Sequence, residues 1–361
     1  MNLAERTYLD HAATSPMRPE AREAMIEGML HWANASSPHA EGRAARAALE
    51  DARARIKAAL GWEHTLIFTS GASEALSLAL QRVRGGRRWI SAVEHDAVFR
   101  AAPDAGILPV DVAGDVDEQA VAEVLAGGGT PVVAIQRVNP ETGKVQPIER
   151  FDHAIREGGG ILVSDCVQWG GRIFLPQADM IVISAHKIGG PPGIGALLVR
   201  DLGQLEPTGG QEYGYRGGTE NLPAALGFAA AIEALMAPAE PDLALHDADF
   251  QMRRRICDAG GIAVGGHGDF AGHILAVAMP GLSAAAQLMR FDMKGFAVSA
   301  GSACSSGTLK ESRVLKAFGV APEMASHTIR VSTGWSTTPD ELRRFADAWE
   351  MISAEAGSRA A

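Results

Sequence analysis

Short apolar runs alternate along this chain with longer stretches rich in alanine and glutamate. The apolar runs predict strands at residues 65–68, 131–135, 161–164 and 180–183. The other stretches have the composition of helices, at residues 40–60, 117–125 and 148–157. Apolar strands that alternate with helices are typical of a mostly parallel sheet covered on both faces. The first two thirds of the sequence therefore predict a large α/β domain.

The composition changes near residues 237–241, where Ala-Pro-Ala-Glu-Pro predicts a loop or a linker. Beyond this point we expect strands at residues 274–278 and 295–298, with helices at residues 283–291 and 339–355. This pattern is typical of a smaller α+β domain. The sequence as a whole therefore predicts a large α/β domain followed by a small one.

The charge and the composition argue against several classes of function. The chain has 361 residues, with 33 Lys and Arg against 43 Asp and Glu, and a formal net charge of −10. This charge disfavours binding to nucleic acid and to anionic membranes, and no apolar run approaches the roughly 20 residues that span a bilayer. The first ten residues hold no apolar signal-peptide core. Three cysteines are too few and too scattered for a disulfide framework or a zinc site. We therefore expect no metal and a reducing, cytoplasmic setting.

Two polar residues follow predicted strands, where ligands of open α/β sheets bind. Lys187 lies in a loop rich in glycine and proline after the strand at 180–183. It is either an ordinary surface lysine in a turn or a Schiff-base lysine. Asp165 follows the strand at 161–164. It is either the N-cap of the next helix or the acidic partner that the ring nitrogen of pyridoxal phosphate requires.

Two further loops contain residue types that can support chemistry. Thr-Ser-Gly-Ala-Ser-Glu at residues 69–74 joins a strand to a helix. Its free backbone amides can hold a phosphate, although such residues are also common helix caps. Cys304 lies among small polar residues at 299–307, which is the setting of a reactive thiol rather than of a packed one. We expect Cys257 to pack within a helix and Cys166 to be a small buried residue.

In their order along the chain, these segments resemble cysteine desulfurases, which are class V aminotransferase-like enzymes of fold type I that depend on pyridoxal 5′-phosphate. The resemblance covers nearly the whole chain. Its motifs are Tyr-Leu-Asp-His-Ala-Ala-Thr at 8–14, Asn-Ala-Ser-Ser-Pro-His at 34–39, Phe-Thr-Ser-Gly-Ala-Ser-Glu at 68–74, Val-Glu-His at 93–95, residues 184–195, Arg-Gly-Gly-Thr-Glu-Asn at 216–221, the Cys304 loop, and Thr-Ile-Arg-Val-Ser at 328–332. Each motif alone is a modest signal, whereas the ordered set is highly specific.

The resemblance implies a fold and an assembly. The fold is a large α/β domain with a mostly parallel seven-stranded sheet and a smaller α+β C-terminal domain. The large, cofactor-binding domain would comprise residues 15–250. The small domain would comprise residues 1–14 and 251–361 and would contain the catalytic cysteine loop. The enzyme would be a homodimer with shared active sites.

The resemblance also implies a role for each residue of the cofactor site. Lys187 would hold the cofactor as a Schiff base, and Asp165 would pair with its pyridinium nitrogen. His95 would stack on the ring and Gln168 would bind the phenolate oxygen. The phosphate ligands would be Ala72, Ser73, Ser184, His186 and, from the neighbouring subunit, Thr219.

The implied reaction converts L-cysteine to L-alanine and transfers the sulfur to Cys304 as a persulfide. Arg330 would clamp the substrate carboxylate as a bidentate pair, with help from Asn34. The reacting form of Cys304 would be the thiolate. The segment between Val298 and Val314 matches the long-loop group of the family, which implies direct delivery of sulfur to an iron–sulfur scaffold or another acceptor protein.

Three positions depart from the family pattern. Pro140 stands where the family commonly has an asparagine that contacts the phenolate oxygen, and proline has no side-chain donor. We therefore expect altered cofactor electronics. Cys166 stands where the family usually has alanine. The chain ends soon after the helix at 339–355, whereas some members have a longer tail that docks the scaffold, so we do not expect that docking mode.

Two other functions fit parts of this pattern. A selenocysteine lyase or another class V lyase or aminotransferase would use the same scaffold, but an aminotransferase has no need of the Cys304 thiol. A degenerate, non-catalytic partner in sulfur transfer is favoured slightly by Pro140. The presence of Lys187, Asp165 and Cys304 together argues against that partner.

Overall fold

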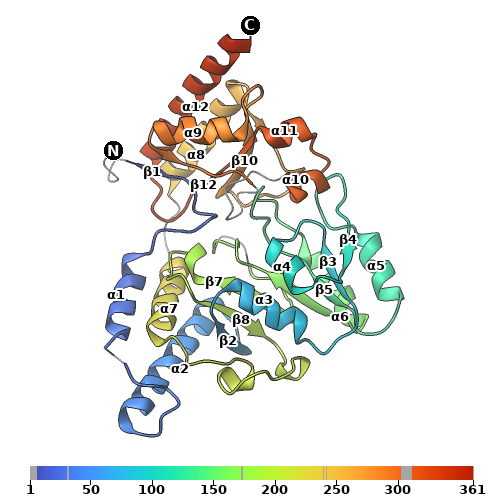
Figure 1. Ribbon diagram of the computed structural model, residues 1–361, viewed down its shortest axis with the longest axis vertical. Coiled ribbons are helices and arrows are strands. Elements are labelled where there is room, and N and C mark those ends of the chain that lie inside the picture. Colours follow the sequence, from blue (N-terminus) through green and yellow to red (C-terminus); the bar gives the residue numbers. More distant parts are fainter. Residues whose placement is uncertain are drawn as a thin grey trace.

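The computed structural model describes residues 6–30, 32–171, 174–238, 240, 242–301 and 311–360, with side chains up to residue 356. Figure 1 shows two lobes, one above the other. The lower one, which we call the large lobe, is built on a seven-stranded sheet. The upper one, the small lobe, contains the first strand and the C-terminal part of the chain, so both ends of the chain lie in it.

The sheet of the large lobe has the order β2-β8-β7-β6-β5-β3-β4. Only β8 runs antiparallel to its neighbours, β7 and β2, and the other pairs are parallel. The prediction of a mostly parallel, seven-stranded sheet is therefore confirmed. The strands are β2 (Thr65–Thr69), β3 (Arg88–Ser91), β4 (Gly106–Leu108), β5 (Val132–Ala134), β6 (Ile161–Asp165), β7 (Met180–Ser184) and β8 (Gly195–Val199).

Helices cover both faces of this sheet because its strands are apolar on both sides. Along β7, Ile181 and Ile183 pack in the layer that contains α2 and α7, whereas Met180 and Val182 pack in the layer that contains α3 and α4. This alternation follows from the two-residue period of a strand. The helices are α1 (Pro19–Gly28), α2 (Ala40–Leu60), α3 (Ala72–Gln81), α4 (Asp96–Ala101), α5 (Glu118–Ala126), α6 (Asp152–Glu157) and α7 (Leu222–Met236).

The small lobe has its own apolar core. Phe291 stacks on Phe345 and on Trp349, with ring centroids 4.9 and 5.9 Å apart, and Leu9 from the N-terminal segment joins this core. Strand β10 (Ile274–Ala278) lies between β12 (Thr328–Ser332) and β9 (Ile262–Ala263), antiparallel to both. The other elements are β1 (Thr7–Tyr8), β11 (Phe296–Ala297), α8 (Leu243–Asp258), α9 (Ala284–Met293), α10 (Arg313–Ala317), α11 (Pro322–Ser326) and α12 (Pro339–Ala360).

Most elements predicted from the sequence form within a few residues of their expected bounds. The helix predicted at 40–60 is α2, with the same limits. Two local predictions are wrong. Cys257 is exposed on α8 rather than packed, and no helix begins within residues 166–171, so Asp165 is not the N-cap of one. Cys166 is fully buried, as predicted. The domain boundaries at residues 15 and 250 stay a prediction.

No helix in the part of the chain that the structure describes is both long and apolar enough to cross a membrane.

Candidate active site

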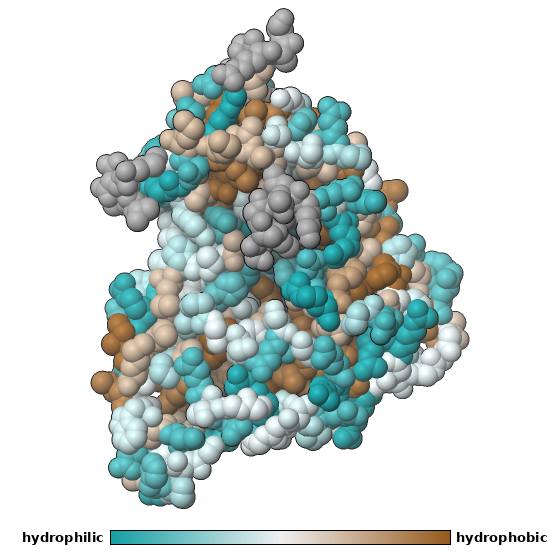
Figure 2. Space-filling view, viewed as in Figure 1, coloured by the Kyte–Doolittle hydropathy of each residue, from teal (hydrophilic) through white to brown (hydrophobic). Residues whose placement is uncertain are grey.

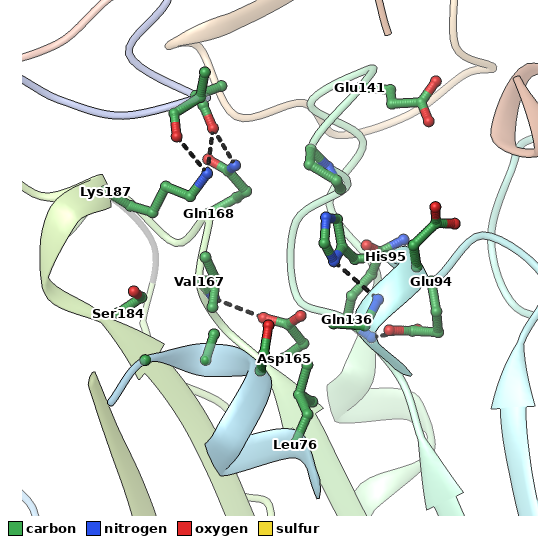
Figure 3. Close-up of a pocket in the computed structure, with 18 of the residues that line it drawn as sticks. Leu76, Glu94, His95, Gln136, Glu141, Asp165, Val167, Gln168, Ser184 and Lys187 are labelled. Carbon is green, nitrogen blue, oxygen red and sulfur yellow. Dashed lines mark hydrogen bonds between the residues drawn. The ribbon is translucent and has the colours of Figure 1, made fainter. Parts of the chain in front are cut away.

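A cavity of about 680 Å³ lies where the two lobes meet. Its large-lobe wall comes from the carboxyl ends of strands and the first turns of α3 and α4, and Figure 3 shows these side chains around it. The sequence-predicted site residues that line it are Ala72, Ser73, His95, Asp165, Gln168, Ser184, His186, Lys187 and Arg330. Residues that are far apart in the sequence therefore converge on one site, as ligands of open α/β sheets require.

Lys187 ends a short 3₁₀ turn, η3 (Ala185–Lys187), directly after β7. Its Nζ donates to the carbonyl oxygens of Ala12 and Ala13, at 2.7 and 2.8 Å. Burial, together with the positive charge of Arg330, lowers the pKa of this amine to about 8. An amine with this pKa is neutral, and therefore nucleophilic, much closer to neutral pH than an ordinary lysine. Lys187 is thus not an ordinary surface residue.

Asp165 is the last residue of β6, and its carboxylate lies on the floor of the cavity. Its Oδ1 accepts a hydrogen bond from the backbone nitrogen of Val167 at 2.9 Å. Burial raises the pKa of Asp165, while His95 and Lys187 act in the opposite direction. A buried carboxylate of this kind is stabilised by any cation placed above it.

His95 caps the first turn of α4. Its Nδ1 accepts from the backbone nitrogen of Ala97 at 3.1 Å, so the neutral ring must have its proton on Nε2. Burial lowers the pKa of His95, which favours this neutral form. The ring therefore offers an uncharged aromatic face and one N–H donor.

Glu94 and Gln136 also line the cavity, and sequence reasoning assigned them no role. Glu94 is buried, and its Oε1 accepts from the backbone nitrogen of Gln136 at 2.7 Å. Burial and the neighbouring Asp165 raise the pKa of Glu94 well above its usual value, which favours the neutral form of this carboxyl. The signal in the sequence is its position directly before His95, three residues after β3 ends.

The N-terminus of α3 forms an open cradle for an anion. Gly71 has a φ of +147°, and a Cβ placed on it would meet no atom within 4 Å, nor would one on Gly193 across the cavity. Gly195 lets the strands approach, since a Cβ there would lie 3.0 Å from Gly71 Cα. Free helix N–H groups, the hydroxyls of Ser73 and Ser184, and open space suit a phosphate group.

Arg330 comes from β12 of the small lobe and is mostly buried. One of its terminal nitrogens donates to the carbonyl oxygen of Pro140 at 2.8 Å, and the other donates to Asp10 Oδ1 at 2.9 Å. A guanidinium held in this way presents a fixed positive charge at the top of the cavity. The acidic partner Asp10 belongs to the Tyr-Leu-Asp motif, but its role could not be read from the sequence.

Two predicted residues, Thr219 and Asn34, are not brought to this cavity. Both are exposed and do not line it, and Asn34 Oδ1 accepts from the backbone nitrogen of Ser36 at 2.8 Å. Cys304 lies outside the described residues. The described residues on either side of its segment, Gly301 and Glu311, do line the cavity.

Comparison with known proteins decides the family. The chain matches the family described as aminotransferase class-V over residues 7–345. It belongs to that family. It is 35% identical over 368 residues to the putative cysteine desulfurase IscS 1 of Bacillus subtilis, covering 95% of this chain and 97% of that protein. It is 33% identical over 367 residues to the cysteine desulfurase IscS 1 of Archaeoglobus fulgidus, covering 94% and 95%.

Solved structures agree with this assignment. The NifS-like protein from Rickettsia africae superposes with a TM-score of 0.88 at 30% identity and covers 96% of this chain and 99% of its own. The structure described as SspA in complex with cysteine has a TM-score of 0.76 at 29% identity, covering 90% and 98%. The predicted fold of a class V aminotransferase-like enzyme is therefore confirmed.

Class V aminotransferases use pyridoxal phosphate, and the cavity fits this group. It combines a lysine amine of lowered pKa, a buried carboxylate, a neutral histidine ring and an open anion cradle. These features match the aldehyde, the pyridine nitrogen, the ring face and the phosphate of the cofactor. Lys187, Asp165, His95 and the first turn of α3 are the residues that would hold it.

Proposed function

We propose that this protein is a pyridoxal phosphate-dependent cysteine desulfurase, which converts L-cysteine to L-alanine and passes the sulfur to Cys304 as a persulfide. The observation that carries this proposal is the convergence of Lys187, Asp165 and Arg330 on one cavity that adjoins both described ends of the Cys304 segment. The near full-length similarity to cysteine desulfurases supports it.

Each residue has a role that follows from its surroundings. Pyridoxal phosphate, when bound, withdraws electrons from the substrate Cα and weakens its bonds to hydrogen. Lys187 Nζ accepts the Cα proton, because its pKa of about 8 gives it a much larger neutral fraction near pH 7 than an ordinary lysine has. Asp165 supplies the negative charge under the ring, and Arg330 binds the substrate carboxylate.

Sulfur transfer requires a nucleophile with access to the substrate sulfur. The Cys304 thiolate attacks that sulfur, so an S–S bond forms as the Cβ–S bond breaks. Cβ keeps the electron pair of the broken bond and takes up a proton, which balances the one that the Cys304 thiol lost on ionising, and the carbon skeleton leaves as alanine. The other cysteines are less suited to this task. Burial raises the pKa of the Cys166 thiol to about 12, and Cys257 is exposed on α8 and does not line the cavity.

We further propose a homodimer in which Thr219 of one subunit contacts the phosphate bound by the other. Thr219 is exposed and lies outside the cavity of its own chain. The end of α1 and the residues after it expose Ile26, Met29, Leu30 and Trp32. Figure 2 shows brown side chains at the corresponding edge of the large lobe. Exposed apolar patches of this kind mark interaction surfaces.

The sulfur acceptor belongs to the same proposal. An iron–sulfur scaffold or another acceptor protein would take the persulfide sulfur, in a reducing cytoplasm that regenerates the thiol.

Pro140 lines the cavity and offers only its carbonyl, which Arg330 already occupies. We therefore propose that Gln168 is the main donor to the cofactor's phenolate oxygen. Its amide Nε2 now donates to the carbonyl oxygen of Ala12 at 2.8 Å.

Mass spectrometry of the holoenzyme after a brief incubation with cysteine tests the proposal. We expect one added sulfur on the Cys304 peptide and one alanine released per sulfur. Cys304→Ser should abolish the added sulfur, whereas Cys257→Ser, which removes an exposed thiol, should not. Unchanged sulfide production by Cys304→Ser would overturn the proposal.

A further inference from the structure

One carboxylate touches both described ends of the segment that contains Cys304. Ser312 Oγ, on the C-terminal side, donates to Glu141 Oε2 at 2.5 Å. On the N-terminal side, a Cβ placed on Gly301 would lie 2.5 Å from the same oxygen. The absence of a side chain at Gly301 therefore lets the backbone pack directly against Glu141. Both contacts bring the two ends of the segment to one point.

Glu141 is itself held rigidly by the large lobe. Its backbone nitrogen donates to Asn139 Oδ1 at 2.9 Å. The amide of Asn139, which is fully buried, donates in turn to the carbonyl oxygen of Val93 at 3.0 Å. The residue between them, Pro140, holds Arg330 through its carbonyl. The same short turn thus supports the substrate-binding arginine and the contact with the Cys304 segment.

Figure 3 shows Glu141 apart from the cluster of Asp165, Glu94 and His95, on the side of the pocket away from Leu76. This is the side where the small lobe meets the cavity. Glu141 therefore lies between the floor, where the cofactor would bind, and the chain segment that would supply the thiol.

We propose that Glu141 is a positioning residue that fixes the base of the Cys304 segment against the cavity, and so sets the geometry of sulfur transfer. This inference rests on the proposed function. A segment whose two ends are held together samples fewer conformations than a free one. Transfer between two reacting sulfurs depends steeply on their mutual position, and a displacement of about 1 Å can cost about 100-fold in rate.

Ser312 strengthens the attachment because its hydroxyl makes two bonds at once. It donates to Glu141 and accepts from the backbone nitrogen of Leu315 at 3.0 Å, as the N-cap of α10. A second attachment joins the same helix to the large lobe, since Arg313 pairs with Asp96 at 2.8 Å. That pair is exposed and contributes less, so the partly buried carboxyl of Glu141 is the principal attachment.

The test compares substrate binding with sulfur transfer in the holoenzyme. Rapid mixing with cysteine reports binding as a change in cofactor absorbance, and quenched samples report the Cys304 persulfide by mass spectrometry. For Glu141→Ala we expect binding within about twofold of wild type and persulfide formation slower by at least about tenfold. Glu141→Gln should restore most of the rate, because an amide oxygen can accept from Ser312. Glu323→Gln, at an exposed carboxylate on α11 that does not line the cavity, is the control and should behave as wild type.

Gly301→Ala changes the other partner in the contact between Gly301 and Glu141. The added Cβ should displace the Glu141 carboxyl and slow persulfide formation, and the double variant with Glu141→Ala should be no slower than either single one. Normal transfer by Glu141→Ala, equal slowing by Glu141→Ala and Glu141→Gln, or additive losses in the double variant would overturn the inference. A wild-type holoenzyme that forms no persulfide would instead overturn the proposed function.

Discussion

The floor of the cavity, formed by Asp165 and His95, and its roof, formed by Arg330 and the residues that hold it, are built in different ways. On the floor, Asp165 and His95 follow strands of one sheet, and each is held by a backbone amide two residues further along the chain. On the roof, Arg330 depends on Asp10 and on the carbonyl of Pro140, which are 320 and 190 residues away in the sequence. The floor is thus a local product of strand ends, whereas the roof combines a contact within the small lobe, Arg330 with Asp10, and one between the lobes, Arg330 with Pro140.

This difference separates the two parts of the reaction. The floor sets charge, because burial raises the pKa of both of its carboxyls, Asp165 and Glu94. The roof sets position, because Arg330 is held by Asp10 and by the carbonyl of Pro140. Changes on the floor should therefore alter the chemistry itself, and changes on the roof should alter substrate affinity and the alignment of sulfur transfer.

Asp165→Asn should produce the largest effect, because it removes the floor's negative charge. We expect kcat to fall by about 100-fold or more, the usual cost of losing a preorganised electrostatic group, and the cofactor absorbance to change. Steady-state alanine release and absorption spectra measure both. Cys166→Ala changes the next residue, a buried thiol whose pKa is about 12, and should leave kcat within about twofold. Equal losses in the two variants would contradict a role for the charge.

Arg330→Lys should have the next largest effect and should act on affinity. An ammonium cannot bind a carboxylate in bidentate fashion while it also holds Asp10 and the Pro140 carbonyl. We expect KM for cysteine to rise by about 30-fold, which corresponds to about 2 kcal/mol, with a smaller change in kcat. Initial rates over a range of cysteine concentrations measure this split. A fall confined to kcat would place Arg330 on the chemical step instead.

Glu94→Gln should have a small effect on catalysis, within a few-fold, because burial favours the neutral form of the carboxyl, which an amide resembles. Its effect on stability should depend on pH. Burial raises the pKa of Glu94 in the folded protein. The wild type therefore loses stability as the pH rises from the pKa of glutamate in the unfolded chain, about 4.3, towards the pKa in the folded protein. The glutamine variant has no such loss, because its amide does not titrate. In urea unfolding, the free energy of unfolding of the variant relative to that of the wild type should therefore be more favourable at pH 8 than at pH 5. A difference that is the same at both pH values would show that Glu94 is ionised.

Arg313→Gln should have the smallest effect. It removes an ion pair between the lobes, Arg313 with Asp96, whose side chains are 48% and 40% exposed. Exposed pairs of this kind contribute about 0–1 kcal/mol, so we expect less than about 1 kcal/mol in the free energy of unfolding. A larger loss in urea titrations would show that the roof depends on this pair as much as on buried contacts.

Much of the floor could be predicted from the sequence. Apolar runs locate the ends of β6 and β7, and a polar residue at such an end must lie at the edge of the sheet where ligands bind. Asp165 and Lys187 were found in this way. Glu94 was missed because its raised pKa depends on full burial beside Asp165, which no pattern of neighbouring residues reveals.

The sequence by itself determined the periodicities, the ordered motifs and therefore the family, because these are properties of residues close together along the chain. Only the tertiary structure decided that Cys257 faces solvent, that Asp10 holds Arg330, and that Glu141 meets both Gly301 and Ser312. These features depend on how segments far apart in the sequence pack together, and packing is fixed by the sum of many weak interactions rather than by any local pattern.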